Sequence, residues 1–195
     1  MRTANISRKT AETDVSVSLT LEGAGRGAID TGVGFLDHML TLLCKHGKFD
    51  LDVKCVGDTD VDDHHSVEDI GICMGDALAQ ALGDCRGITR YADCFLPMDE
   101  SLVLVAVDIS GRGSLTLDLP LPAKKVGTFD TELVEEFLTG FARRAGITLH
   151  VRLIAGKNTH HIIEAAFKGI GRALRRAVAV DPEFASEIPS SKGVL

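Results

Sequence analysis

The sequence predicts an α+β protein, a tandem duplication of one strand-strand-helix-strand-helix unit with sheets packed against helices. Two observations lead to this prediction. The run His64-His65-Ser66-Val67-Glu68 returns as His160-His161-Ile162-Ile163-Glu164, an offset of 160 − 64 = 96 residues in a chain of 195. Alternating and amphipathic segments also follow one another in the same order in both halves. We therefore expect one domain over residues 1–195, made of two repeats at about 1–92 and 93–195.

The first half supplies each element of the unit in turn. Residues 15–22 alternate between polar and apolar side chains, which is the period of a half-buried strand. From Phe35 to His46 the apolar residues recur at helical spacing, and Gly47 can end that helix. The expected elements are a strand over 15–22, a turn over 23–27 with a short strand after it, a helix over 35–46, a strand over 49–56, and a helix from 64 to about 82 capped by Asp62-Asp63.

The second half repeats this order of elements. We expect strands over 102–109 and 115–119 around a turn at 110–113, a helix over 130–145, a strand over 148–154, and a helix from 160 to about 178 behind a Thr159 cap. Two short matches support the alignment of the halves, Gly25-Arg26-Gly27 with Gly111-Arg112-Gly113 and Leu51-Asp52-Val53-Lys54 with Leu149-His150-Val151-Arg152.

Composition limits the class of protein and of partner. The formal net charge of −7 argues against nucleic acid, because phosphate neutralisation needs a basic surface, whereas a small phosphorylated ligand needs only a few local cations. The five cysteines never form a Cys-x-x-Cys pair, which favours reduced, buried thiols over a disulfide framework. The amino-terminal residues hold no apolar core of a signal peptide, and no stretch approaches the roughly 18 apolar residues of a membrane span. We expect a cytoplasmic protein that binds no membrane.

The repeated histidines and glutamates have the spacing of metal ligands. His64 and Glu68 are four residues apart near the start of an expected helix, so both project from one face and can bind one divalent ion. His65 points about 100° away and can serve a second ion or another subunit. The same holds for the second run, and all donors are nitrogen or oxygen, which favours Mn(II) or Fe(II), with Zn(II) as a further option. The alternative interpretation is a solvated helix start without a metal.

Aligning the two halves also places His38 against Glu136. His38 lies 64 − 38 = 26 residues before His64, and Glu136 lies 160 − 136 = 24 residues before His160. Both side chains can bind a metal ion, so we interpret them as ligands, although a lone histidine is usually an ordinary helix-face residue.

Several other residues have the chemistry of anion binding. Arginine forks and hydroxyl donors suit phosphate geometry, although most arginines on a protein are simply solvated. The residues of this kind are Arg90, Arg112, Lys168 and the tail 189–193. Glu12 on its own is interpreted as a surface acid, and Asp99-Glu100 as a linker turn between the halves.

Five motifs, spread over nearly the whole chain, form one ordered set. They are Phe35-Leu-Asp-His-Met39, Asp62-Asp-His-His-Ser-x-Glu-Asp69, Pro97-Met-Asp-Glu100, Gly156-Lys-Asn-Thr-His-His-Ile-Ile-Glu-Ala165 and Pro189-Ser-Ser-Lys-Gly-Val-Leu195. Together they resemble the imidazoleglycerol-phosphate dehydratase family, and the two His-His blocks are the most specific. The resemblance implies the dehydration of D-erythro-imidazole-glycerol phosphate to imidazole-acetol phosphate and water, a step of histidine biosynthesis.

The resemblance also implies a cofactor, a fold and an assembly. It implies two Mn(II) ions per active site, a duplicated fold similar to the second domain of ribosomal protein S5, and a homo-oligomer of 24 subunits with active sites between subunits.

By position, the resemblance assigns roles to individual residues. The implied metal ligands are His38, His64, His65, Glu68, His160, His161, Glu164 and, where some relatives have histidine, Glu136. We take His65, His161 and Glu12 as the catalytic residues, with Glu12 as our candidate for the acid or base that moves a proton. The implied substrate contacts are Glu12, His38, His46, His64, Glu68, Arg90, Arg112, His160, Lys168, Ser190, Ser191 and Lys192.

Two other functions fit the metal-binding pattern alone. A dinuclear metallohydrolase would direct a metal-bound hydroxide at a phosphate or an amide. A non-catalytic metal-storage or metal-sensing protein would take up metal without depending on the anion-binding residues. The sequence also leaves open which histidine binds which ion, because both i,i+3 and i,i+4 pairings with each glutamate are feasible.

Overall fold

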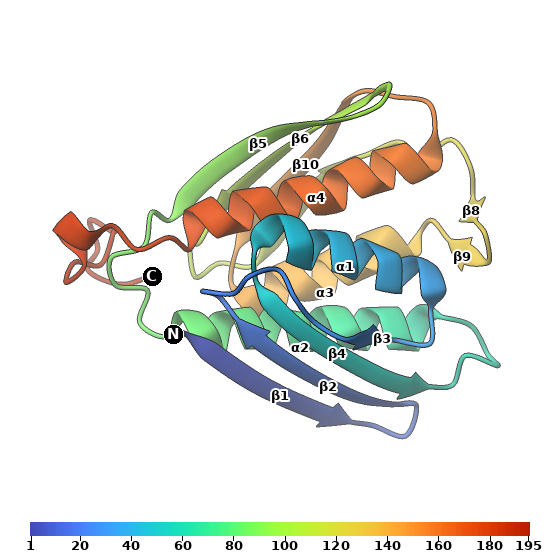
Figure 1. The fold of residues 1–195 in the computed structure, drawn as a ribbon, viewed down its shortest axis with the longest axis horizontal. Coiled ribbons are helices and arrows are strands. Elements are labelled where there is room, and N and C mark those ends of the chain that lie inside the picture. The colour runs from blue at the N-terminus through green and yellow to red at the C-terminus, as the bar shows by residue number, and fades with distance from the viewer.

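The computed structural model describes residues 1–195 as two four-stranded sheets with four helices packed between them (Figure 1). The first half contains β1 (Thr3–Lys9), β2 (Thr13–Thr20), β3 (Ile29–Asp30), α1 (Gly34–Gly47), β4 (Asp50–Gly57) and α2 (His64–Leu82). The second half contains β5 (Tyr91–Met98), β6 (Ser101–Asp108), β7 (Ser114–Asp118), α3 (Leu133–Ala145), β10 (Thr148–Ala155) and α4 (Thr159–Ala177). A small hairpin of β8 (Lys125–Val126) and β9 (Phe129–Asp130) precedes α3, and a 3-10 turn, Pro182–Phe184, lies in the tail.

The two sheets have matching topology, which confirms the duplication. Their strand orders are β1-β2-β4-β3 and β5-β6-β10-β7, so each half places its strands in the same sequence across the sheet. In both sheets the first three strands are antiparallel, and the short strand at the far edge runs parallel to its neighbour. The α+β class and the packing of sheets against helices are as the sequence predicts.

The helices of the two halves pair crosswise, α1 with α4 and α2 with α3 (Figure 1). Glycines allow these close approaches. A Cβ on Gly171 of α4 would lie 2.5 Å from the carbonyl oxygen of Leu43 in α1, and one on Gly75 of α2 would lie 2.6 Å from that of Phe141 in α3. Each pair of helices therefore contains one helix from each half, and this exchange decides which predicted ligands can meet.

Aromatic residues make up only 5% of the chain, and the interior is filled mainly by aliphatic side chains. Phe137 and Phe167 are the largest fully buried side chains among leucines, isoleucines and valines of all four helices and both sheets. All five cysteines are free thiols, and four of them are buried, which agrees with the expectation of reduced, buried cysteines. No helix is both long enough and apolar enough to cross a lipid bilayer.

Each sheet begins with a strand that the sequence analysis did not predict. β1 buries only Ala4 and so shows no regular alternation. β5 alternates in burial, but its exposed positions include the apolar residues Tyr91 and Phe95, which conceals that period in the sequence. Both are edge strands, where Pro97 of β5 is tolerated. Their presence corrects the interpretation of Asp99-Glu100, which form the turn of the β5–β6 hairpin and not a linker.

Two predicted helix starts also need correction. The helix expected from residue 130 begins at Leu133, because Asp130 belongs to the β8–β9 hairpin. The final helix begins at Thr159 and is capped by Asn158, whose side chain accepts a hydrogen bond from the backbone N–H of His161.

Candidate metal centre and anion-binding residues

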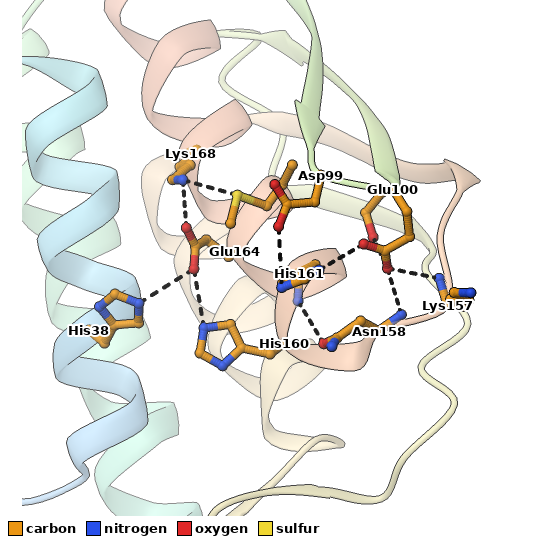
Figure 2. Close-up of polar contacts among 11 residues, drawn as sticks. His38, Asp99, Glu100, Lys157, Asn158, His160, His161, Glu164 and Lys168 are labelled. Atoms are coloured by element: carbon orange, nitrogen blue, oxygen red, sulfur yellow. Dashed lines mark hydrogen bonds and ion pairs between the residues drawn. The ribbon is translucent and has the colours of Figure 1, made fainter.

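Three predicted ligands meet where α1 packs against α4: His38 of α1 and His160 and Glu164 of α4 (Figure 2). Their ligating atoms all lie within 4.8 Å of one another, and they form the only group of three or more such side chains in the chain. Glu164 Oε2 lies 3.1 Å from His160 Nε2 and 3.5 Å from His38 Nε2. The i, i+4 spacing within α4 and the crossing of α1 therefore bring two imidazole nitrogens to one carboxylate oxygen.

The Glu164 carboxylate is buried and ionised. Only 7% of the residue is exposed, and its second oxygen, Oε1, accepts a hydrogen bond from Lys168 Nζ at 2.5 Å (Figure 2). Burial acts to raise the pKa of Glu164, but Lys168, followed by His160, outweighs burial and holds that pKa below its ordinary value. The group thus presents an anionic oxygen and two imidazoles, a donor set that suits a divalent ion such as Mn(II).

His161 is held by carboxylates on the other side of α4 (Figure 2). Its Nδ1 lies 2.7 Å from Glu100 Oε2, and its Nε2 lies 3.7 Å from Asp99 Oδ2. The Glu100 hydrogen bond raises the pKa of His161, and the same contact lowers the pKa of Glu100 to about 2. A carboxylate on Nδ1 fixes the ring and leaves Nε2 without a hydrogen bond, as in many metal-binding histidines.

His65 at the start of α2 repeats this arrangement. Its Nδ1 lies 3.0 Å from Asp58 Oδ2, and its Nε2 lies 3.8 Å from Glu12 Oε1. The Asp58 hydrogen bond raises the pKa of His65 above its ordinary value. Glu12 lies in the turn of the β1–β2 hairpin, the place that Asp99 takes in the other half. The duplication thus extends to the carboxylates that surround each histidine.

The remaining predicted ligands, His64, Glu68 and Glu136, do not form a corresponding group. All three side chains are partly exposed, and none makes a side-chain hydrogen bond or an ion pair. Two carboxylates without a cation repel each other, which gives a physical reason for the open arrangement. The structure therefore gathers predicted ligands in one place, between α1 and α4, and the roles of all the predicted ligands stay predictions.

The predicted anion-binding residues fall into two hollows. Arg90, Arg112, Ser190, Ser191 and Lys192 line a hollow of about 390 Å³ against the carboxy-terminal tail. Arg90 lies there between Asp108, 2.8 Å from its Nε, and the backbone oxygen of Pro189, to which its Nη1 donates at 2.8 Å.

The second hollow, of about 410 Å³, lies along the outer side of α4. His46 and Lys168 line it together with Arg172, Arg176 and a stretch of β5. Burial, followed by the charges of Lys168 and Arg172, lowers the pKa of His46. A charged imidazole is thus disfavoured at His46, first by burial and then by the positive charge of its neighbours.

Within one chain, the tail hollow lies far from the metal-competent group. The backbone N–H of Arg90 donates to the carbonyl oxygen of Ala177 at the end of α4, whereas His160 lies at its beginning. These positions are 177 − 160 = 17 residues apart, or about 25 Å at 1.5 Å per residue. A ligand of a few carbons cannot contact both regions of the same chain.

Asp58 and Glu100, the partners of His65 and His161, were missed by the sequence analysis. The signal that would have found Glu100 lies in the edge strands: once β1 and β5 are recognised, their hairpin turns place Glu12 and Asp99-Glu100 at equivalent positions. No pattern singles out Asp58, which lies in the loop between β4 and α2.

Comparisons with known proteins identify relatives over the whole chain. The family model for imidazoleglycerol-phosphate dehydratase matches residues 31–174. The imidazoleglycerol-phosphate dehydratase of Desulforamulus reducens is 61% identical over 194 residues, covering 100% of this chain and 98% of its own, and that of Methylobacterium radiotolerans is 59% identical over 195 residues, covering 100% of both. A crystal structure of the Staphylococcus aureus enzyme superposes with a TM-score of 0.84 at 43% identity, covering 92% of this chain and 99% of that one. The Pyrococcus furiosus enzyme in complex with (S)-C348 superposes with a TM-score of 0.85 at 38% identity, covering 97% and 100%.

Proposed function

The chain belongs to the imidazoleglycerol-phosphate dehydratase family, and on that basis we propose that it dehydrates D-erythro-imidazole-glycerol phosphate to imidazole-acetol phosphate, in histidine biosynthesis, with the help of divalent metal ions. The relatives that share its full length carry this enzyme's name, so a carbon-oxygen lyase is the class of activity expected of it.

The observation that supports metal dependence is the group formed by His38, His160 and Glu164. Glu164 is a buried, ionised carboxylate that pairs with Lys168 through one oxygen and directs the other at two imidazoles, so that second oxygen and the imidazole nitrogens together offer a set of donors to a cation. Nitrogen and oxygen donors without a thiolate favour Mn(II). We infer a second ion from the duplicated residues His64, Glu68 and Glu136, with His65 and His161 completing the ligand sets, which gives two Mn(II) per active site.

We further propose that each active site is shared between copies of the chain. The tail hollow with Arg90 and Arg112 lies about 25 Å along α4 from His160, so the residues of this hollow and the metal-competent group of the same chain cannot contact one substrate together. The Nε2 atoms of His65 and His161 make no hydrogen bond within the chain, so they are likewise available to a metal ion shared with a neighbouring copy. This requirement supports a homo-oligomer, and the family resemblance leads us to expect 24 subunits.

The chain's own residues divide the work of the reaction. Arg90, Arg112, Ser190 and Lys192 bind the phosphate, and this remote binding energy orients the reacting carbons. A bound metal ion supplies Lewis acidity that favours the anionic form of the substrate's imidazole ring. The hydroxyl leaves as water from the carbon attached to the ring, the neighbouring carbon loses its proton, and the resulting enol becomes the ketone.

Glu12 is the residue we assign to that proton. Its side chain is 54% exposed in the β1–β2 turn, where a substrate can reach it, and it lies 3.8 Å from His65 Nε2, next to a proposed metal ligand. A carboxylate in such a place can take a proton from carbon and return it elsewhere.

The test is a Mn(II) titration of metal-free protein followed by an assay for the ketone. We expect ketone formation to rise with bound Mn(II), without release of inorganic phosphate. Phosphate release instead of ketone would favour a metallohydrolase, and metal uptake with no turnover would favour a metal-storage or sensing protein. Full turnover in the metal-free protein would refute the metal requirement.

A further inference from the structure

Lys168 occupies the boundary between the metal-competent group and the positive hollow on α4. Its Nζ lies 2.5 Å from Glu164 Oε1, whereas the other carboxylate oxygen faces His160 and His38 (Figure 2). The two side chains are only 17% and 9% exposed, so the ion pair is poorly screened by water. Without a metal, Glu164 therefore has its own cation already in place.

The other half of the chain has no such cation. The offset of 96 residues aligns Glu164 with Glu68 and Lys168 with Ile72. Glu68 accordingly makes no ion pair, although it comes from the same position of the duplicated helix. The lysine is thus a feature of one half only and not a requirement of the duplicated fold.

The hollow next to Lys168 is suited to an anion. It is lined by His46, Arg172 and Arg176, and the single acidic residue in its lining is Asp93. Arg172 makes no ion pair, and Arg176 donates only to the backbone oxygen of Asp93, at 3.1 Å. Guanidinium groups without carboxylate partners favour a phosphate or another oxyanion.

We propose that Lys168 is a shared cation that links the two ligands: a divalent ion bound by His38, His160 and Glu164 displaces it from the carboxylate, and a phosphate group in the adjoining hollow receives it. This inference rests on the proposed metal dependence and adds that metal and phosphate bind cooperatively. Phosphate draws the competing ammonium away from Glu164 and so favours the metal, and by thermodynamic reciprocity the metal favours phosphate equally.

The test measures Mn(II) affinity by the electron paramagnetic resonance signal of free Mn(II), on the purified protein without substrate, with and without inorganic phosphate. The variants are Lys168→Met, which removes the charge at similar size, Lys168→Arg, which keeps it, and Lys45→Met as a control. Lys45 is exposed on α1 and makes no ion pair, so its substitution changes net charge by the same amount.

In the wild-type protein we expect phosphate to tighten one class of Mn(II) site by about fivefold or more, the lower range of measured couplings. Lys168→Met should tighten that class to a similar extent without phosphate and abolish the effect of phosphate. Lys168→Arg and Lys45→Met should retain the phosphate effect.

Two results would overturn the inference alone: wild-type Mn(II) affinity in Lys168→Met without phosphate, or a phosphate effect of undiminished size in that variant. A protein that takes up no Mn(II) in any form would overturn the proposed metal dependence and this inference together. The three outcomes are distinguished by the same set of titrations.

Discussion

Replacing Gly171 by alanine tests whether the crossing of α1 and α4 builds the metal-competent group. The new Cβ would lie 2.5 Å from the carbonyl oxygen of Leu43 and 3.0 Å from the backbone nitrogen of Gly47. Ordinary contact begins at 3.4 Å, so α1 has to move by about 3.4 − 2.5 = 0.9 Å at this point. Because both neighbours are backbone atoms, no side-chain rotation can relieve the clash.

The expected effects are a loss of stability and a loss of metal affinity. Overpacking of this kind costs about 1–3 kcal/mol, which should outweigh the gain of up to about 1 kcal/mol from replacing glycine by alanine in a helix. His38 lies on α1 and its partners lie on α4, so a shift near 0.9 Å exceeds the roughly 0.2 Å that ligand distances tolerate. Mn(II) binding to this group should therefore weaken.

The duplication provides a control with matched stability. Gly75→Ala places a Cβ 2.6 Å from the carbonyl oxygen of Phe141 and should destabilise the chain to a similar extent. It separates α2 from α3, which carry His64, Glu68 and Glu136, so it should weaken the second proposed ion and spare the one at His38. Gly34→Ala, with no atom within 4 Å of the new Cβ, should change neither property. The assays are urea unfolding at fixed protein concentration and Mn(II) titration. Loss of the same class of Mn(II) site in the Gly171 and Gly75 variants, or unchanged stability of the Gly171 variant, would refute the reasoning.

Three further predictions follow from the surroundings of the histidines. Glu12→Gln should lower ketone formation by about a hundredfold or more while Mn(II) uptake is retained, and near wild-type turnover would remove Glu12 from the reaction. His65→Ala and His161→Ala should each lower the Mn(II) content of the purified protein by elemental analysis, and full content in both would contradict their assignment as ligands. In metal-free protein, Glu100→Gln should return the pKa of His161 toward 6.5 in an NMR titration. The stability difference from wild type should be greatest between about pH 4.5 and 6.5, because the ion pair is lost at higher pH through the raised pKa of His161 and in acid as Glu100 is protonated near pH 2. A His161 pKa equal to that of the wild-type protein would exclude the contact.

The sequence predicts the elements of the fold well where one face is buried and poorly at the edges. β2 and β6 alternate strictly between buried and less buried residues, and both lie next to the centre of a sheet. β1 buries one residue of seven, so the pattern that reveals its neighbour is absent. The alternation of apolar and polar residues reflects the burial of one face of a strand, and a strand such as β1 that buries almost nothing shows little alternation.

The site shows the same division between local and long-range information. The i, i+4 spacing of His160 and Glu164 is a property of one helix, and it was sufficient to place both on one face. Which helix then packs against that face depends on glycines such as Gly171, whose role is visible only in the packed structure. The alignment of His38 with Glu136 identified equivalent positions, but it could not indicate that each would join the helix of the opposite half.

Divergence after duplication has given the two halves different charges around the same backbone. Glu164, Lys168 and His38 correspond to Glu68, Ile72 and Glu136, so one side carries a carboxylate matched by an ammonium and the other carries two unmatched carboxylates. The group of His38, His160 and Glu164 needs little rearrangement to accept a cation but has to release Lys168. His64, Glu68 and Glu136 have to come together first, but their two carboxylates then attract a cation more strongly. If both groups of ligands bind the same metal, their affinities and their dependence on phosphate have to differ, because only the group with Glu164 has a neighbouring lysine, Lys168, that also lines the anion hollow.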